Sequence, residues 1–299
     1  MSSLQSPEFR ARILRDEPMS RHTSWRTGGP ADYFYTPHDR DELSAFLRGL
    51  PLETPLYWVG LGSNLLVRDG GLRGVVICTQ GAFTRLERRT QTTLYCESSV
   101  PCTRLARQSV KWGLAEGEFF GGIPGTFGGA LAMNAGAYGN ETWKHVVNVE
   151  VIDRSGVRRV RDASEYRPEY RQVQRPANDE WFLAAELQFA VQPAGGIDRV
   201  RQLSERRKQT QPLGEWSCGS VFTNPPGDHA ARLIEAAGLK GCRIGGAVVS
   251  TKHANFIINE GSARAAELEQ LILHVQATVE QVHGVKLHPE VRIVGDAAP

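Results

Sequence analysis

Residues 121–139 read GGIPGTFGGALAMNAGAYG, a segment with seven glycines and no charged side chain. Glycine tolerates positive φ angles, and successive glycine N–H groups can form a concave nest that binds an anion. So dense a run of small residues is rarely a mere connection between elements. The segment therefore predicts a backbone that lies directly against a bound group such as a phosphate.

A second glycine loop, Gly60-Leu61-Gly62-Ser63-Asn64, follows an apolar run earlier in the chain. It is not a GxGxxG motif, since Leu65 stands where the third glycine belongs, and it is not a P-loop, since Ser63 follows Gly62. An ordinary glycine turn is the alternative interpretation of this loop. Taken with residues 121–139, it predicts a large dinucleotide held by two separate loops.

Bulk properties limit the class of protein. The 299 residues suffice for two or three domains, and the net charge of +2 gives no electrostatic case for nucleic acid or a membrane surface. No apolar run is long enough to span a bilayer, and the N-terminus lacks a signal-peptide pattern. The five cysteines, an odd number without a CxxC pair, argue against a disulfide scaffold and indicate small buried residues in a reducing cytoplasm. No metal site is predicted.

Hydrophobic periodicity predicts an α+β chain up to about residue 190. A helix is expected over 39–50, capped by Asp39 or Asp41, and a second over 103–113. Strands are expected in LYWVGLGSNLLV, Val75–Ile77, 92–100, 146–153, VRRVRD and 181–191, with a hairpin turn at Ser155-Gly156.

A glycine- and proline-containing segment, 192–196, predicts a linker to a second α/β unit. Helices are expected there over 197–209, over 229–237 and from about Ser262, as the cap, to His283. The last helix has an apolar stripe of Ala265, Leu268, Leu271, Ile272, Val275, Val279 and Val282. A strand is expected in VRIVG, at the end of the chain.

Seven segments, in order from residue 27 to residue 292, together resemble the UDP-N-acetylenolpyruvoylglucosamine reductase (UDP-N-acetylmuramate dehydrogenase) family. They are Thr27-Gly28-Gly29-Pro30-Ala31-Asp32, GLGSNLLVRDGG, GGIPGTFGGALAMNAGAYG, Tyr170-Arg171, SCGSVFTNP, GCRIGGAVVSTKHANFIIN and His288-Pro289-Glu290-Val291-Arg292. Each segment alone is weak evidence, whereas the set is very specific and spans nearly the whole chain.

The resemblance implies an α+β fold with an N-terminal segment, 1–25, and a two-lobed FAD-binding domain of the PCMH, or vanillyl-alcohol-oxidase, type over 26–192. Its lobes are expected at about 26–78 and 79–192, followed by a smaller α/β substrate-binding domain over 197–299. It also implies a cytoplasmic bacterial enzyme of peptidoglycan precursor synthesis with noncovalent FAD. NADPH would reduce the flavin, and a hydride would pass to C3 of the enolpyruvyl ether of the UDP-sugar substrate. The oligomeric state is left open, a monomer included.

Three catalytic residues follow from the resemblance. Hydride addition creates negative charge that needs a fixed cation or hydrogen-bond donor, and Arg171 matches the family's arginine. Glu290 matches a glutamate that either orients Arg171 or polarises the substrate. Ser220 matches the proton donor, a weak acid that suffices because an enolate carbon is strongly basic and the site is dry. Read alone, these residues are a solvated charge, a surface ion pair and a turn residue.

Binding residues follow from the same segments. Substrate contacts are expected from Tyr170, Lys208 and Asn224. For Lys208, an exposed charge on a helix is the alternative interpretation. The residues expected to bind FAD are Gly60, Gly62, Ser63, Asn64, Leu65, Gly122, Pro124, Gly125, Gly128, Gly129, Asn134, Ala135 and Gly136.

Two positions depart from the family pattern. Val173 stands where serine is frequent, which affects how Arg171 is held, and Thr223 stands where lysine is common, which affects phosphate or nicotinamide contacts. The short interval between Arg171 and Ser220 leaves no room for a substrate-capping insertion, so the chain is similar to the shorter, type II subclass.

Two alternatives compete with this interpretation. A flavin oxidase of the same fold would often tether its cofactor through His or Cys; His22 is the nearest histidine to the first FAD-facing motif, and no strong tethering signal is present. A catalytically inactive nucleotide-binding module should have lost Arg171, Ser220 or Glu290, and all three are present. A DNA-binding role has no basic stripe to support it.

Overall fold

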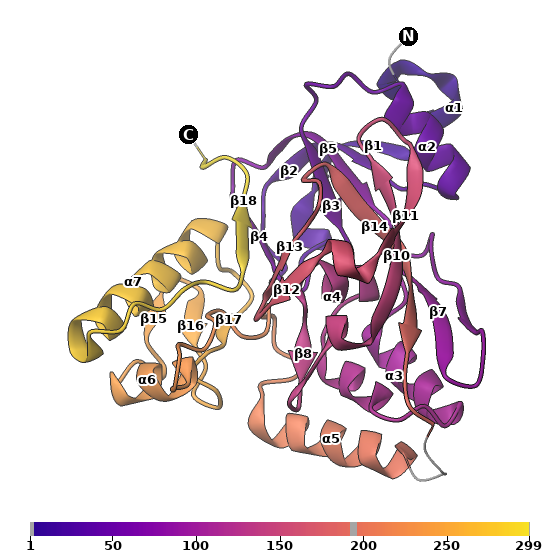
Figure 1. Ribbon diagram of the computed structural model, residues 1–299. Coiled ribbons are helices and arrows are strands. Elements are labelled where there is room, and N and C mark those ends of the chain that lie inside the picture. The colour runs from indigo at the N-terminus through magenta and orange to yellow at the C-terminus, as the bar shows by residue number, and fades with distance from the viewer. Residues whose placement is uncertain (1–2, 192–195, 299) are drawn as a thin grey trace. The chain divides into compact units, whose positions relative to one another are not determined.

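The computed structural model describes residues 3–191 and 196–298 (Figure 1). The chain forms two compact units, each built from separate segments. Unit 1 comprises Met1–Leu14, Tyr35–Gly60 and Val76–Arg206, and unit 2 comprises Arg15–Phe34, Leu61–Val75 and Arg207–Pro299. The predicted linker at 192–195 lies outside the described residues, and the predicted domain boundaries stay predictions.

A five-stranded antiparallel sheet is the centre of unit 1. Its order is β11-β10-β14-β7-β6. These strands span Arg158–Asp162, Val146–Asp153, Glu180–Gln188, Thr93–Glu97 and Leu86–Arg88, respectively. The alternating valines of β10 place Val149 and Val151 in the core, which confirms the strand predicted there. The hairpin between β10 and β11 turns at Gly156, whose φ of 76° suits glycine.

Helices complete unit 1. They are α1 Pro7–Arg10, α2 Arg40–Arg48, α3 Cys102–Lys111, α4 Phe127–Met133 and most of α5 Gly196–Thr210. Asp39 caps α2, because its Oδ1 accepts the N–H groups of Asp41 and Glu42 at 2.9 and 2.8 Å. The helices predicted over 39–50, 103–113 and 197–209 are confirmed, and Asp39 rather than Asp41 is the cap.

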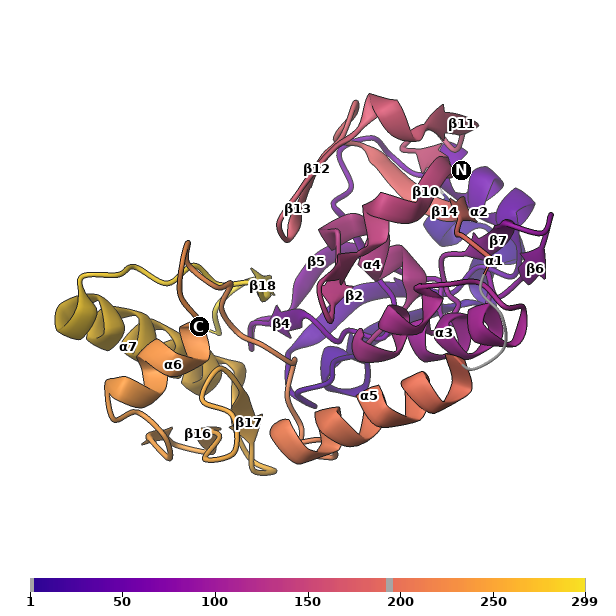
Figure 2. The ribbon, with the colours of Figure 1, turned by 60° about the horizontal axis from the view of Figure 1, so that its bottom comes forward.

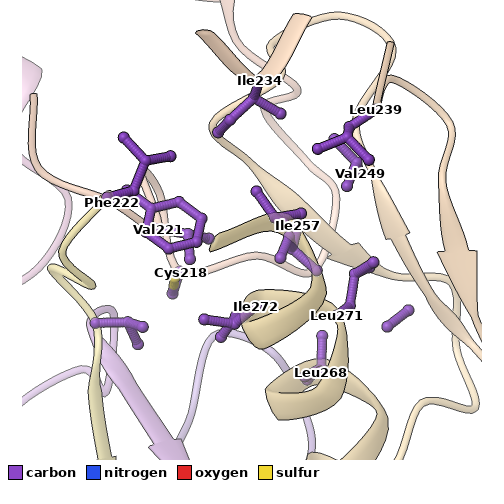
Figure 3. Packing of buried hydrophobic residues seen from close by; sticks show 14 of the residues in the cluster. Cys218, Val221, Phe222, Ile234, Leu239, Val249, Ile257, Leu268, Leu271 and Ile272 are labelled. Atoms are coloured by element: carbon purple, nitrogen blue, oxygen red, sulfur yellow. The ribbon is translucent and has the colours of Figure 1, made fainter. Parts of the chain in front are cut away.

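In unit 2 the long helix α7, Ala265–His283, packs beside the three-stranded antiparallel sheet β15-β16-β17 and α6, Ala230–Ala236 (Figure 2). The strands span Arg243–Ile244, Ala247–Val249 and Ile257–Asn259. Figure 3 shows the core between them, where Leu268, Leu271 and Ile272 of α7 face Ile257 and Val249.

Two details of the α7 prediction are wrong. Ser262 is not the cap: the helix begins after Arg264, and the Asp69 carboxylate accepts the N–H groups of Ala265 and Ala266, each at 2.9 Å. A carboxylate from another loop thus replaces the local serine cap. Val282 is 55 % exposed, because the last turn of α7 extends past the core.

The remaining strands are short. A four-stranded sheet has the order β1-β2-β5-β3, with β1 Ile13–Pro18, β2 Pro30–Tyr35, β5 Leu72–Cys78 and β3 Leu56–Val59. Pairs are formed by β4 Leu65–Val67 with β18 Arg292–Val294, β8 Gly136–Ala137 with β9 Asn140–Glu141, and β12 Arg167–Glu169 with β13 Gln172–Gln174. The 3-10 turns of the described residues lie at Ser3–Gln5, Met19–Arg21, Gly117–Gly122, Thr142–His145 and Ala163–Glu165. The predicted α+β class is confirmed.

All five cysteines are free thiols, and Cys78, Cys96, Cys102 and Cys218 are buried, whereas Cys242 is partly exposed. Burial raises the pKa of Cys102 to about 12, so that thiol stays protonated. No helix in the described part of the chain combines the length and the apolar character needed to cross a membrane.

Candidate functional site

The two glycine loops meet at Thr126 in unit 1. A Cβ at Gly60 would lie 2.5 Å from Thr126 Oγ1, so the first loop needs glycine to pack there. Among the described residues, a Cβ at Gly129 would meet only the same oxygen, at 3.8 Å, and Gly129 is exposed. The first residue of the first loop therefore packs on Thr126 of the second glycine segment, and Gly129 leaves open space near the same side chain.

The glycine-rich segment contains a short helix that the sequence did not predict, α4. Gly125, before it, has a φ of 110°, and Asn134, after it, is left-handed at φ 46° and ψ 48°. Gly128 packs closely against Ser98 within unit 1, since a Cβ at position 128 would lie 2.8 Å from the Ser98 Cβ. The glycines thus serve two purposes: Gly128 allows close packing within the protein, whereas Gly129 leaves its Cα face clear.

Asn134 connects this segment to the hairpin that carries the predicted arginine. Its side chain is buried, its Oδ1 accepts the Trp143 N–H at 3.1 Å, and its Nδ2 donates to the Glu169 carbonyl oxygen at 3.0 Å. The Nδ2 group also donates to the Glu141 carboxylate at 3.2 Å. Asn134, predicted to bind FAD, therefore holds the protein chain around the glycine segment.

Arg171 lies at the turn of the β12–β13 hairpin, and β13 runs beside α4 (Figure 2). Its φ of 60° is left-handed, and its guanidinium donates from Nη2 to the Gly136 carbonyl oxygen at 3.1 Å. The guanidinium carbon also lies 5.2 Å from the centre of the Tyr170 ring, within cation–π range. The structure thus places Arg171 against the glycine segment, as a cation held by backbone contacts.

The remaining FAD candidates of the first loop belong to unit 2. Gly62 has a φ of 60°, and a Cβ there would lie 2.0 Å from the His22 carbonyl oxygen, so only glycine fits. Asn64 donates from Nδ2 to the Glu290 carbonyl oxygen at 3.0 Å, and its own carbonyl accepts the Arg292 N–H at 3.1 Å. The first glycine loop and the strand after Glu290 therefore form one hydrogen-bonded structure.

Ser220 and Glu290 are brought together within unit 2. The Glu290 N–H donates to the carbonyl oxygen of Val221 at 2.7 Å, and Phe222 pairs with Pro289. The negative charge of Glu290 adds to burial in raising the pKa of Cys218, two residues before Ser220. Figure 3 shows Cys218, Val221 and Phe222 on the core of unit 2. Within the described residues, the Ser220 hydroxyl has no hydrogen-bond partner, which leaves it available to a ligand.

The predicted substrate residues are less constrained by the structure. Tyr170 and Lys208 are exposed, and the Lys208 carbonyl accepts a hydrogen bond from Lys252 Nζ at 2.5 Å. Asn224 uses its Oδ1 to accept the Ala230 N–H at the start of α6, at 3.0 Å. Their contacts with substrate stay predictions.

The two departures from the family pattern have structural roles. Val173 pairs with Pro168 across the hairpin and packs on the core of unit 1. Thr223 donates both its N–H and its hydroxyl to the His288 carbonyl oxygen, at 2.9 and 3.3 Å.

The other predicted FAD residues are placed as follows. Gly122 packs on Ala137 and the Tyr138 ring, and Gly136 packs on the Asn140 carbonyl. Ala135 N–H donates to the Ala130 carbonyl oxygen at 2.9 Å, and Leu65 pairs with Arg292 in the β4–β18 ladder. Ser63 is partly exposed and Pro124 is exposed.

Sequence reasoning missed two residues of this region. Thr126 is the single aliphatic hydroxyl within 121–139, and that isolation was a usable signal. Asn255 holds the Val221–Phe222 segment, which follows Ser220, through hydrogen bonds across 33 positions of sequence, and nothing local marks it.

Comparison with known proteins decides the family. The sequence profile of an FAD-binding domain matches residues 31–161, and that of the C-terminal domain of UDP-N-acetylenolpyruvoylglucosamine reductase matches 211–294. The chain is 57 % identical to the UDP-N-acetylenolpyruvoylglucosamine reductase of Alkalilimnicola ehrlichii, over 94 % of each chain. It is 50 % identical to that of Nitrosococcus oceani over 100 % of each chain. The chain belongs to the UDP-N-acetylenolpyruvoylglucosamine reductase family.

The fold agrees with this family. The crystal structure of the UDP-N-acetylenolpyruvylglucosamine reductase from Thermus caldophilus superimposes with a TM-score of 0.79 and 31 % identity, over 94 % of this chain and 97 % of that one. As a member of the UDP-N-acetylenolpyruvoylglucosamine reductase family with an FAD-binding domain, the chain is an FAD-containing oxidoreductase. The predicted family and fold class are confirmed.

Most of the predicted site residues lie in the segments that the two family profiles match. Every predicted FAD residue, from Gly60 to Gly136, lies in the segment matched by the FAD-binding profile. Ser220, Asn224 and Glu290 lie in the C-terminal match, whereas Tyr170, Arg171 and Lys208 lie outside both. The open face at Gly129, beside the neighbour it shares with Gly60, fits a flat or extended cofactor placed against the backbone.

Proposed function

We propose that this chain catalyses the NADPH-dependent reduction of UDP-N-acetylglucosamine enolpyruvate to UDP-N-acetylmuramate, in cytoplasmic peptidoglycan precursor synthesis. Membership in the family supports this reaction. The observation that supports the residue assignment is the hydrogen bond from Glu290 N–H to the Val221 carbonyl oxygen, which joins the segment of Ser220 to the segment of Glu290 within unit 2.

FAD, held by the glycine loops, would supply the redox chemistry, the net transfer of a hydride from NADPH to C3 of the enolpyruvyl ether. The carbon–carbon double bond of the ether is then lost, and C2 must take a proton to complete the reduction. The overall reduction adds one hydride from NADPH and one proton from the protein to the substrate. The protein then regains a proton from solvent.

Ser220 is the proposed source of that proton. Its hydroxyl is not engaged by the described protein residues, so it can donate to C2 when substrate binds. Donation leaves an alkoxide that must regain a proton from solvent before the next turnover.

Arg171 is the proposed cation for the negative charge that develops at C2 and its carboxylate. Its contact with Gly136 and its stacking on Tyr170 hold the guanidinium in place before substrate binds, so little reorganisation is needed during the reaction. Glu290 has two proposed roles, orienting Arg171 or polarising the substrate by hydrogen bonding.

The proposed binding residues remain those of the glycine loops for FAD, and Tyr170, Lys208 and Asn224 for the UDP-sugar. Lys208 offers an exposed cation for a phosphate, the charge that a uridine diphosphate requires. The short interval between Arg171 and Ser220 supports assignment to the type II subclass, in which other groups close over the substrate.

Product analysis tests this function. Purified protein, FAD, NADPH and the enolpyruvyl UDP-sugar are incubated without oxygen, and the nucleotide sugar is examined by mass spectrometry and NMR. The expected product carries two more hydrogen atoms than the substrate and a lactyl methyl group, with one NADPH oxidised for each molecule formed. NADPH oxidation only in air, with the sugar unchanged, would indicate a flavin oxidase instead.

A further inference from the structure

Asn255 makes three hydrogen bonds to the two residues that follow Ser220. Its main-chain carbonyl oxygen accepts the Val221 N–H at 2.8 Å, and its side-chain Oδ1 accepts the Phe222 N–H at 2.9 Å. Its Nδ2 donates to the Phe222 carbonyl oxygen at 2.8 Å. One carboxamide thus satisfies both backbone groups of Phe222, as a neighbouring strand would.

The same segment is held from a second direction by Glu290. The Val221 carbonyl oxygen accepts the Glu290 N–H at 2.7 Å, and Val291 N–H lies 3.4 Å from the same oxygen. Asn255 and the Glu290 segment therefore fix the N–H and carbonyl groups of Val221, while the Ser220 hydroxyl beside it has no hydrogen-bond partner among the described residues. Phe222 anchors the segment in the core of unit 2 (Figure 3).

We propose that Asn255 is a positioning residue for the protonation step, acting through the Val221–Phe222 backbone to hold the Ser220 hydroxyl in register with Glu290. The proposal rests on the proposed function, in which Ser220 donates the proton. Its physical basis is that a proton donor must reach its acceptor within hydrogen-bond distance. Asn255 is only 4 % exposed, and both atoms of its carboxamide bond to the backbone of Phe222.

Loss of either half of the carboxamide should shift the segment. In Asn255→Asp one oxygen still accepts the Phe222 N–H, but the other faces the Phe222 carbonyl oxygen without a proton between them. A displacement of about 1 Å at a reacting group costs about 10²-fold in rate. The expected defect is therefore a selective slowing of the step that uses Ser220.

Asn259 provides a matched control. It is equally buried, its Nδ2 donates to the Trp25 carbonyl oxygen at 2.7 Å, and its Oδ1 accepts the N–H groups of Gly261 and Ala263, each at 2.9 Å. Its carboxamide therefore clamps backbone in the same unit without touching the segment after Ser220. Asn259→Asp should reproduce the loss of stability and not the selective rate defect.

The test compares the two half-reactions of FAD-loaded protein in anaerobic stopped flow. Asn255→Asp should reduce its flavin with NADPH at the wild-type rate and reoxidise it with the enolpyruvyl UDP-sugar about 10- to 100-fold more slowly. Equal slowing of both half-reactions, or an unchanged reoxidation rate, overturns the proposal. Absence of reoxidation in the wild-type protein would instead refute the proposed function.

A double substitution separates positioning from general damage. If Asn255 acts through Ser220, adding Asn255→Asp to Ser220→Ala should slow reoxidation no further, whereas independent defects would multiply. Should Asn255→Asp fail to fold, Asn255→Ser, which keeps a small polar group, replaces it in both experiments.

Amide hydrogen exchange of the protein without FAD gives a readout that does not depend on activity. The peptide containing Val221 and Phe222 should exchange faster in the Asn255 variant and at the wild-type rate in Asn259→Asp. Unchanged exchange of this peptide in the Asn255 variant would contradict the proposed clamp.

Discussion

Asn134 donates a hydrogen bond from its side-chain Nδ2 to the carbonyl oxygen of Glu169, with 3.0 Å between the two atoms. Glu169 ends the strand that leads directly into Tyr170 and Arg171, and Arg171 in turn donates to Gly136 at 3.1 Å. The segment that fits FAD and the hairpin that carries the proposed cation are thus bonded to each other at two points within unit 1.

This bonding predicts a stability loss at Asn134. Asn134→Gly keeps the left-handed backbone but leaves the buried Trp143 N–H and Glu169 carbonyl without their partner, which should cost about 1–3 kcal/mol of unfolding free energy. Asn134→Ala should cost about 1–2 kcal/mol more, because alanine is strained in that conformation. Urea unfolding measures both, and a glycine variant as stable as wild type would show that these bonds contribute nothing.

Gly129 and Gly128 should respond in opposite ways to alanine. Gly129→Ala adds a methyl to open space on a helix, so the unfolding free energy should hold or rise, while FAD binding weakens by about 1–3 kcal/mol if the cofactor lies there. Gly128→Ala meets Ser98 and should destabilise the protein itself. Thermal unfolding without FAD and fluorescence titration with FAD separate the effects; unchanged FAD affinity in Gly129→Ala would remove Gly129 from the cofactor site.

Ser220→Ala should affect only the second half-reaction. Flavin reduction by NADPH should proceed as in wild type, and reoxidation by the UDP-sugar should slow by about 10²–10⁴-fold, the usual contribution of a general acid. The exposed Ser262, replaced by alanine, is the control. Stopped-flow absorbance follows both steps, and equal slowing of the two would show that Ser220 is not the proton donor.

His145 should make unit 1 sensitive to acid. Burial between Phe119 and Phe189 lowers its pKa, so the folded state disfavours the charged ring. Between the ordinary histidine value of about 6.5 and this lowered pKa, the unfolded chain binds more protons, and stability should fall as pH falls through that window.

The measurement is the melting temperature of the FAD-free protein across that pH range. His145→Gln should show a smaller decrease on acidification than wild type, whereas replacing the exposed His274 should leave the decrease unchanged. An identical acid response in wild type and His145→Gln would contradict the role of His145.

The sequence was informative where structure is set locally. The valines of β10 and the cap of α2 depend on neighbouring residues; the strand was predicted, and the cap was narrowed to Asp39 or Asp41. Helix α4 was not, because glycine lowers helix propensity and tertiary packing of Gly128 against Ser98 holds the helix in place. The cap of α7 by Asp69 and the clamp by Asn255 join residues far apart in sequence, so no local pattern indicates them.

The same limit applies to the candidate site. Composition identified the glycine loops, but only the structure distinguishes their roles. Gly129 has open space beside it, whereas Gly128 packs closely against Ser98. The motifs identified Ser220 and Glu290, and the fold adds the hydrogen bond that joins their segments. The contacts of Lys208 and Asn224 with substrate stay predictions, because their positions on the surface do not select a ligand.

The most direct measurement is the visible spectrum of the purified protein through one anaerobic cycle. NADPH should bleach the flavin absorbance, and the enolpyruvyl UDP-sugar should then restore it in the absence of oxygen. Recovery with that substrate and not with UDP-N-acetylglucosamine is the result that the proposed reductase predicts. A flavin that stays bleached until oxygen is admitted would contradict it.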